Sequence, residues 1–290
     1  MICSRKARCV LPKLEDLPQD IYSLFDPDKD HECSKENLDA FSDNLREILI
    51  QRLRKYTPPA SPLRFSSLGK PDRQIWYEAH PGDYVKEALV PKTYIKFLYG
   101  DIIEQMLLFL AKEAGHEVTH EQAEVEVGGV KGHIDAIIDG TVVDVKSASP
   151  FGYKKFEQGS VTQDDPFGYV AQLAGYANVL TPGQPAAWLA NEKVSGDICI
   201  SPLSTPVIKH HPPEERIEHL KKVIESETPP ERCYEDVPDG ASGNRKLVTG
   251  CSYCAHKFRC WPGLRTFIYS TGPRYLTKVV KEPNIMEVTK

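Results

Sequence analysis

Several features that would place the chain in a specialised class are missing from its sequence. It has no run of about 18 apolar residues, the length that a membrane-spanning helix needs, and no apolar signal core at its N-terminus. Internal repeats and low-complexity tracts are also absent. Basic residues are not in excess: the formal net charge of the 290 residues is −5, so binding to nucleic acid would need a local basic groove. We therefore expect a cytoplasmic protein without membrane contact, built as one large domain or as a domain plus an appendage.

The composition is otherwise that of a globular chain, with 40% hydrophobic and 27% charged residues. The unusual number is the eight cysteines. Thiols stay reduced in the cytoplasm, so these cysteines indicate metal ligands or free thiols rather than disulfides.

The chain is organised around residues 132–147. Two apolar runs, residues 133–138 and 141–146, are joined by Asp139-Gly140. Asp-Gly between β-branched apolar runs is a strong hairpin signal. The sequence therefore predicts two antiparallel strands that otherwise look buried.

Three charged residues interrupt these runs: Asp135 in the first, and Asp144 and Lys146 in the second. Residues two apart on a strand share a face, so Asp144 and Lys146 point the same way, and Asp135 on the partner strand can converge with them. An unpaired buried carboxylate is very costly, so the aspartates should either pair with the lysine or hold a metal ion. Oxygen ligands favour magnesium or manganese, and the carbonyl of Val145 is a further candidate ligand. The lysine would then orient or deprotonate a water, or stabilise negative charge on a phosphate.

Periodicity predicts an α/β chain around the hairpin. Apolar residues at helical spacing predict helices at residues 36–55, 93–114, 167–179 and 212–225. Alternation predicts strands at residues 118–128, 185–193 and 197–201. Residues 1 to about 32 are expected to form a loosely held lead, and residues 150–165 a polar loop. The order of elements fits a mixed central sheet flanked by helices.

Further site candidates lie on the predicted helices and loops. Glu104 stands in an apolar helix, one turn past Gly100, and is a candidate third metal ligand beside the two aspartates. Gln172 and Tyr176 are four apart on the next helix, so they share a face and could position a water or a DNA end; the alternative is an exposed glutamine and a half-buried tyrosine. The basic residues that would contact phosphates, or simply remain solvated, are Lys70, Arg73, Lys154 and Lys155.

The cysteines gather near the C-terminus. Cys251, Cys254 and Cys260 have the spacing Cys-x2-Cys-x5-Cys, a strong metal-site signal. Cys233 is the best candidate for a fourth ligand and Cys33 the second choice. Such a local four-cysteine site suits zinc, and four thiolates leave no open position, so the centre would be structural.

Taken in chain order, these elements resemble a known nuclease family. Glu104, Asp135, Asp144-Val145-Lys146 and the element from Gln172 to Tyr176 resemble the RecB-like branch of the PD-(D/E)XK nuclease superfamily. The cysteine spacing is similar to that of the CRISPR-associated RecB-like exonucleases, which carry a [4Fe-4S] cluster. The resemblance implies an N-terminal helical extension, a restriction-endonuclease-like core and a cysteine segment with a tail, at residues 1–63, 64–230 and 231–290.

The same resemblance implies hydrolysis of DNA phosphodiesters from ends or on single strands. Mg²⁺ or Mn²⁺ would be bound by Glu104, Asp135 and Asp144, Lys146 would be the catalytic lysine, and Gln172 and Tyr176 would position DNA. A bacterial or phage-infected cell, and a partner protein in recombination or replication, are implied by the resemblance alone.

The chain departs from the family pattern in two places. Glu104 stands where RecB-like enzymes often have histidine, and no cysteine lies near Lys70, so the fourth cysteine ligand must come from elsewhere. A nuclease-fold DNA-binding or assembly subunit with vestigial cleavage is the alternative function. A sequence-specific endonuclease is disfavoured because the sequence offers no separate recognition domain.

Overall fold

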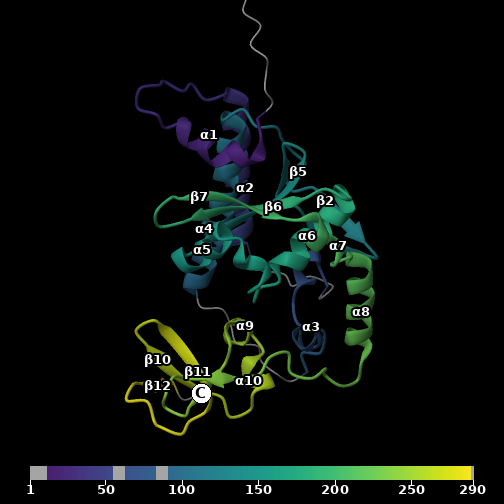
Figure 1. Ribbon diagram of the computed structural model, residues 1–290, viewed down its shortest axis with the longest axis vertical. Coiled ribbons are helices and arrows are strands. Elements are labelled where there is room, and N and C mark those ends of the chain that lie inside the picture. The colour runs from purple at the N-terminus through teal and green to yellow at the C-terminus, as the bar shows by residue number, and fades with distance from the viewer. Residues whose placement is uncertain (1–11, 55–62, 83–90, 289–290) are drawn as a thin grey trace, which may run out of the picture.

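The computed structural model describes residues 12–54, 63–82 and 91–288, and its centre is a five-stranded sheet (Figure 1). Neighbouring strands are antiparallel except β5 and β6, which are parallel, so the sheet is mixed as predicted. Its strands, in spatial order, are β1 (Val118–Thr119), β4 (Ala136–Ile138), β5 (Thr141–Ala148), β6 (Ala186–Glu192) and β7 (Ile198–Leu203).

Helices bury both faces of this sheet, because successive side chains of each strand point to opposite sides. Val142 of β5 packs in one apolar cluster with Leu173, whereas the next residue, Val143, packs in the other with Leu107. Helices α1 (Leu17–Ser23) and α4 (Pro91–Glu113) cover the second face. Helices α6 (Tyr169–Leu180) and α8 (Pro213–Glu225) contribute to the first.

Four predicted helices are confirmed with small shifts in their ends. They are α4, α6, α8 and α2 (Lys35–Leu53), which packs on α4. The predicted end of α2 at Lys55 lies outside the described residues. The other helices are α3 (Asp72–Ala79), α5 (Pro150–Glu157), α7 (Thr205–Lys209), α9 (Thr249–Tyr253) and α10 (Lys257–Cys260), with 3₁₀ turns η1 (Leu14–Asp16), η2 (Phe65–Ser67) and η3 (Ser160–Thr162).

The predicted hairpin turn and its second strand are confirmed, since β4 and β5 pair around Asp139-Gly140. The first strand, expected at residues 133–138, covers only Ala136–Ile138, because His133 pairs with Glu124 in a separate ribbon and Asp135 lies in a bend.

The strand expected before the hairpin is also divided. The predicted strand at residues 118–128 breaks after Thr119, and its second part, β2 (Glu124–Val127), pairs with β3 (Val130–His133) in a separate two-stranded ribbon. The strand breaks because the residues between its parts, such as Gln122 at φ 52°, adopt a conformation that strands do not allow.

Two segments expected to be irregular are ordered. The prediction of a loose lead is wrong for α1, because Leu17 and Ile21 are fully buried against the α4 face of the sheet; residues 1–11 lie outside the described part of the chain. The prediction of a loop at residues 150–165 is also wrong for α5. The Ser149 hydroxyl caps this helix by accepting a hydrogen bond from the backbone N–H of Gly152.

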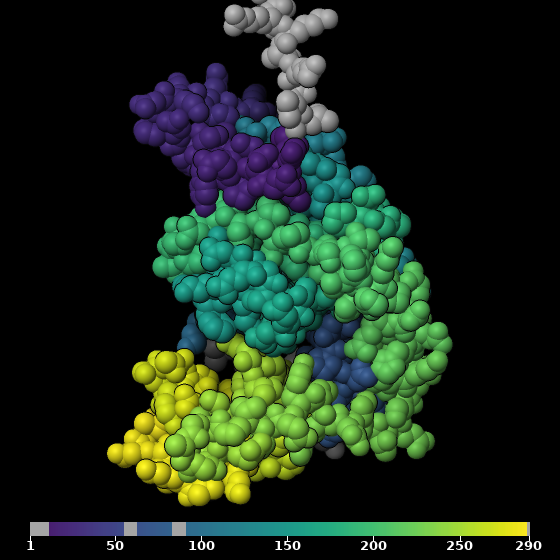
Figure 2. Space-filling view, in the orientation of Figure 1, coloured from purple at the N-terminus to yellow at the C-terminus, as the bar shows by residue number. Residues whose placement is uncertain are grey.

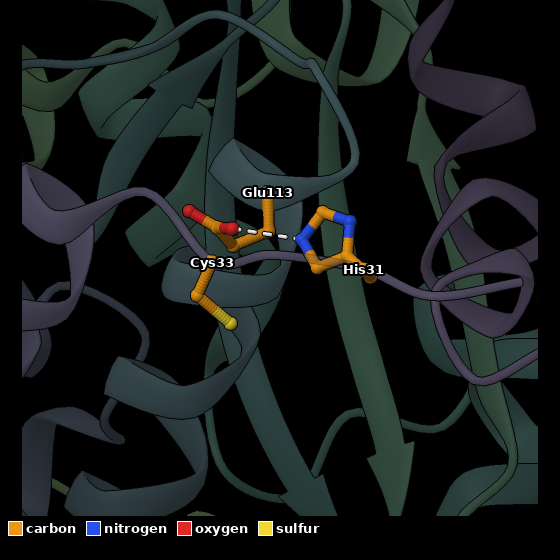
Figure 3. Close-up of side chains that lie close together, drawn as sticks. All are labelled: His31, Cys33 and Glu113. Atoms are coloured by element: carbon orange, nitrogen blue, oxygen red, sulfur yellow. Dashed lines mark hydrogen bonds and ion pairs between the residues drawn. The ribbon is translucent and has the colours of Figure 1, made fainter.

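Hydrogen bonds to Glu113 fix the start of α2 to the end of α4, and we call this group of Glu113, His31, Ser34 and Asn37 the α2 clasp. Figure 3 shows Glu113 with His31 and the neighbouring Cys33. The Glu113 carboxylate accepts hydrogen bonds from the Asn37 amide at 2.6 Å and the Ser34 backbone N–H at 3.1 Å, and it lies 2.8 Å from the His31 ring. Of the residues that the structure describes, only His31, Cys33 and Glu113 form a trio of metal-ligand type with all ligand atoms within 4.8 Å. The donors on Glu113 account for its position without an ion.

The C-terminal residues form a lobe of their own, which lies at the bottom of Figure 2, and the ribbon in Figure 1 shows this lobe below the central sheet. Its antiparallel sheet contains β8 (Val237–Pro238), β9 (Arg245–Lys246), β10 (Arg265–Tyr269), β11 (Gly272–Lys278) and β12 (Glu287–Val288). Although it comes much earlier in the chain, α3 contacts this lobe, since Tyr77 packs against His256 and the Arg259 guanidinium. Within the described ranges, no helix is both long and apolar enough to span a bilayer.

Candidate active site

Two aspartates meet at the end of the hairpin. Asp135 lies in the bend before β4, and continuing the β4–β5 register by one residue places it opposite Asp144. The Val145 backbone N–H donates a hydrogen bond to Asp135 Oδ2 at 2.6 Å, which turns this carboxylate toward β5. Asp144 is buried because β5 is a central strand with both faces covered. The predicted convergence of the two carboxylates is therefore present.

A single cation faces this pair. Lys146 Nζ lies 2.5 Å from Asp144 Oδ2, and its pKa is raised because Asp144 and Asp135 together outweigh the opposing effect of burial. Burial, followed by the charges of Asp144 and Glu104, raises the pKa of Asp135 well above its usual value. Among the described residues, the Lys146 ammonium is the partner of the buried Asp144 Oδ2. The carboxylates therefore cannot all be ionised beside a single lysine without further positive charge.

Glu104 approaches from α4. Burial, then the charges of Asp101 and Asp144, raises the pKa of its carboxyl to about 7, and the Gln122 amide donates a hydrogen bond to its Oε1 at 2.7 Å. The α4 helix comes close to β5 at this point, since a Cβ added to Gly100 would lie 3.6 Å from Ser147 Oγ. Glu104 lines a cleft of about 950 Å³ whose other walls come from α2 and the β2–β3 ribbon.

The donor set fits a divalent cation. Three carboxylates interact electrostatically, and two of them have raised pKa values. In the described structure the ligand oxygens of the three do not all lie within 4.8 Å of one another, so a bound cation would have to draw them together. Hard oxygen ligands of this kind suit magnesium or manganese.

The predicted pair on α6, Gln172 and Tyr176, lies near the aspartates, whose charges act on Tyr176. Tyr176 is only 3% exposed and stacks on Phe65 with ring centroids 4.9 Å apart. Gly132 makes room for it, because a Cβ there would lie 2.6 Å from the tyrosine oxygen. Burial and the charges of Asp144 and Asp135 raise the pKa of Tyr176, and its hydroxyl is hydrogen-bonded to the half-buried Gln172. Direct contact with DNA is thus open to the glutamine and not to the tyrosine.

The basic candidates have different surroundings. Lys70 pairs with Glu78 at 3.0 Å, and Arg73 donates to the Pro230 carbonyl, so the structure gives both of them partners around α3. Lys154 is exposed on α5. Lys155 pairs with Asp164 at 2.5 Å and lines a pocket together with Lys146.

The four cysteines favoured from the sequence line one cavity between α3, α9 and α10: Cys233, Cys251, Cys254 and Cys260. N–H groups approach their sulfur atoms. The His256 N–H donates to Cys254 Sγ at 3.4 Å, and the backbone N–H groups of Arg73 and Gln74 donate to Cys233. Cys33, the second choice for the fourth ligand, lies at the α2 clasp instead.

The cysteine thiols are poorly placed to ionise on their own. Burial, then the neighbouring cysteines Cys254, Cys260 and Cys233, raises the pKa of Cys251 to about 12. The sulfur atoms accept hydrogen bonds from N–H groups, yet each thiolate would raise the pKa of its neighbours. A bound metal cation would supply the positive charge that lets these thiols ionise together.

Three residues of the site were not predicted from the sequence. Asp101 lies one turn before Glu104 on α4, so helical spacing alone could have indicated it. Tyr169 places its ring 5.0 Å from Lys146 Nζ, and Gln122 reaches Glu104 from the β1–β2 connection. No local pattern pairs these last two with their partners, because tertiary packing brings them together.

Comparison with known proteins agrees with this geometry. A search of curated proteins finds no match. The family model of the PD-(D/E)XK nuclease superfamily matches residues 46–261, a span that contains every carboxylate of the candidate site, its lysine and the four cysteines. Since this match covers well over half of the 290 residues, the chain belongs to the PD-(D/E)XK nuclease superfamily.

Proposed function

We propose that the chain is a metal-dependent deoxyribonuclease of the RecB-like branch that hydrolyses phosphodiester bonds from DNA ends or on single strands. The observation that carries this proposal is the convergence of Asp135, Asp144 and Lys146 at one end of the hairpin, with Glu104 facing them from α4. A superfamily member that had lost catalysis would have no need to retain so costly a group of buried charges.

The proposed roles follow from where each side chain lies. Asp135, Asp144 and Glu104, with the Val145 carbonyl, hold Mg²⁺ or Mn²⁺, which when bound lowers the pKa of a water and stabilises charge on the phosphate. Lys146, freed from Asp144, orients the attacking water or neutralises the phosphate. Gln172 positions the DNA strand, and Tyr176 fixes the orientation of Gln172 from the core.

We further propose that Cys233, Cys251, Cys254 and Cys260 hold a structural [4Fe-4S] cluster, with zinc as the alternative. We prefer the cluster because the Cys-x2-Cys-x5-Cys spacing is similar to that of the CRISPR-associated RecB-like exonucleases, whereas a local four-cysteine site also suits zinc. The centre joins α3 of the proposed core, residues 64–230, to the segment 231–290, while residues 1–63 form the N-terminal extension.

The test is cleavage of labelled DNA. Wild-type protein in Mn²⁺ or Mg²⁺ is incubated with end-labelled linear single and double strands and with closed circles. Asp144→Asn should lower the rate by about 10²- to 10⁴-fold, since metal stabilisation of the transition state is worth several kcal/mol. Glu121→Gln is the matched control: this carboxylate lines the same cleft as Glu104 but pairs with Lys112 at 2.5 Å.

Calorimetric titration with Mn²⁺ separates metal binding from catalysis, and it should show a site that Asp144→Asn abolishes and Glu121→Gln retains. Equal cleavage by the two variants would contradict the proposed site, and rapid cutting of closed circles would contradict action at ends. DNA binding by the wild type without any cutting would favour the binding or assembly subunit.

A further inference from the structure

A second hollow begins at Lys146 and shares no lining residue with the cleft at Glu104. This pocket, of about 220 Å³, begins at Lys146 and Ser147 at the end of β5. Its walls come from α5, from the start of α6, and from Thr249 and Tyr253 of α9 in the cysteine segment. The pocket is therefore built jointly by the core and by the segment that carries the cysteine centre.

Three aromatic rings at this pocket are open to solvent. Phe151 is 76% exposed, Phe167 45% and Tyr253 73%. Phe167 and Tyr253 meet edge to face with centroids 5.5 Å apart, and Tyr169, below them, contacts both Phe167 and the Lys146 ammonium. Exposing several large rings together sacrifices burial energy, and such gathered apolar surface marks a binding site.

The charges around the rings suit a phosphate chain. Lys155 stands 5.5 Å from the Phe151 ring, and Lys154 is exposed on the same helix. Asp164 pairs with Lys155, so a phosphate would compete with this carboxylate for the ammonium, whereas Asp165 accepts hydrogen bonds from three backbone N–H groups at the start of α6. Cations and aromatic faces together are the composition of a single-strand binding surface.

The size of the pocket limits its occupant. About 220 Å³ is below the roughly 300–1,000 Å³ of pockets that enclose a whole drug-sized ligand, so it suits one base rather than a base pair. The floor at Lys146 is shared with the candidate active site, so a base held here belongs to the nucleotide beside the phosphate at the aspartates.

We propose that this pocket stacks one unpaired base of the substrate strand on Phe167 and Tyr253, so that the strand is single at the site and is bound without regard to sequence. This inference rests on the proposed function and narrows its substrate class. It also gives the cysteine segment a second role: Tyr253 lies between Cys251 and Cys254, so the loop that holds the metal centre also positions a DNA-binding ring.

The test measures binding of a fluorescent oligothymidine strand in Ca²⁺, with the metal-loaded full chain. Phe167→Ala and Tyr253→Ala should each weaken binding by about 5- to 150-fold, the range for loss of one base–aromatic stack. Phe167→Tyr and Tyr253→Phe should restore it. Phe25→Ala is the control, because this ring is exposed just after α1, on the opposite side of the sheet from the pocket, and should change nothing.

A second probe distinguishes stacking from phosphate contact. A fully abasic strand with the same number of phosphates should bind the wild type as weakly as oligothymidine binds the alanine variants, and these variants should lose nothing further on it. Metal content, measured in every variant, shows whether Tyr253→Ala keeps the cysteine centre, and Phe167→Ala tests the pocket without touching that segment.

The outcomes separate the two proposals. Wild type that cuts DNA while both alanine variants bind oligothymidine normally would overturn the pocket and leave the nuclease intact. Equal loss on single and blunt double strands, or indifference to the missing base, would equally overturn it and assign the rings to another partner such as a protein. Wild type that neither binds nor cuts any DNA would instead remove the proposed function.

Discussion

Two glycines cross so closely that no side chain fits at either one. A Cβ added to Gly168 would lie 2.5 Å from the Gly69 carbonyl carbon, and one added to Gly69 would lie 2.2 Å from Gly168 Cα. Gly168 also has φ +78°, a left-handed conformation. This crossing fixes the start of α6 against the turn after η2, and it lies between Phe167 and Tyr169.

The cost of Gly168→Ala can be worked from these two features. The left-handed conformation costs a residue with a Cβ about 1–2 kcal/mol. Forcing a methyl group into backbone that cannot rotate away adds about 1–3 kcal/mol. We therefore expect a loss of about 2–5 kcal/mol in the free energy of unfolding, enough to endanger a domain of ordinary stability.

Two matched variants divide this cost. Gly183 has φ +80° but nothing within 4 Å of an added Cβ, so Gly183→Ala should lose only the conformational part. Gly69→Ala should lose only the steric part. Urea unfolding followed by circular dichroism measures the free energy of unfolding of all three variants. Each Gly→Ala change lowers the conformational entropy of the unfolded chain by a similar amount, so this effect cancels when the variants are compared. If Gly168→Ala is no more destabilising than Gly183→Ala, the close crossing of Gly69 and Gly168 adds no steric cost, which would contradict this prediction.

Three further predictions concern the ends of the chain and its clasp. Leu17→Ala should cost about 2–5 kcal/mol in urea unfolding because it opens a cavity under α1, whereas Leu38→Ala, at 46% exposed, should cost under about 0.5 kcal/mol; similar values would contradict the docking of α1. Cys254→Ser should reduce bound iron or zinc, measured by elemental analysis, and lower the melting temperature, whereas Cys33→Ser should retain the metal; the reverse result would reassign the ligands. Although burial opposes it, hydrogen bonds from Asn37, His31 and Ser34 lower the pKa of Glu113, so its contribution is complete above pH 4.5 and is lost as the pH falls through the lowered value. Glu113→Gln should therefore cost about 1–3 kcal/mol at pH 7 and progressively less in acid, and a difference that stays constant with pH would contradict this account.

The hairpin and its charges could be predicted because their information is local. Asp139-Gly140 specifies the turn, and the spacing of Asp144 and Lys146 specifies a shared face, so both features survive any arrangement of the rest of the chain. Glu104 could be proposed as a site residue because a carboxylate within an apolar helix is locally unfavourable, and such positions are often functional.

The errors arose where pairing or packing decides the structure. Alternation of apolar and polar residues predicts a strand but not the strand with which it pairs, so the ribbon of β2 and β3 could not be distinguished from the main sheet. The positive φ angles at His120 and Gln122 could not be predicted either, because they occur in residues that are neither glycine nor asparagine. The apolar stretch of α1 is too short to show a helical period. Ser149-Pro150 is a helix-start signal for α5, but the polar composition of the segment favoured a loop.

The docking of α1 determines how far the protein can be shortened. A truncation that starts the chain at residue 46, where the family match begins, would remove Leu17 and Ile21 and expose to water the apolar surface of α4 that they cover. It would also leave His116, whose ring lies 3.2 Å from Asp20 of α1 and 2.6 Å from Asp139 at the hairpin tip, with one of its two carboxylates. A fragment trimmed to the catalytic signature is therefore expected to express as aggregate, and soluble material will require the N-terminal helix.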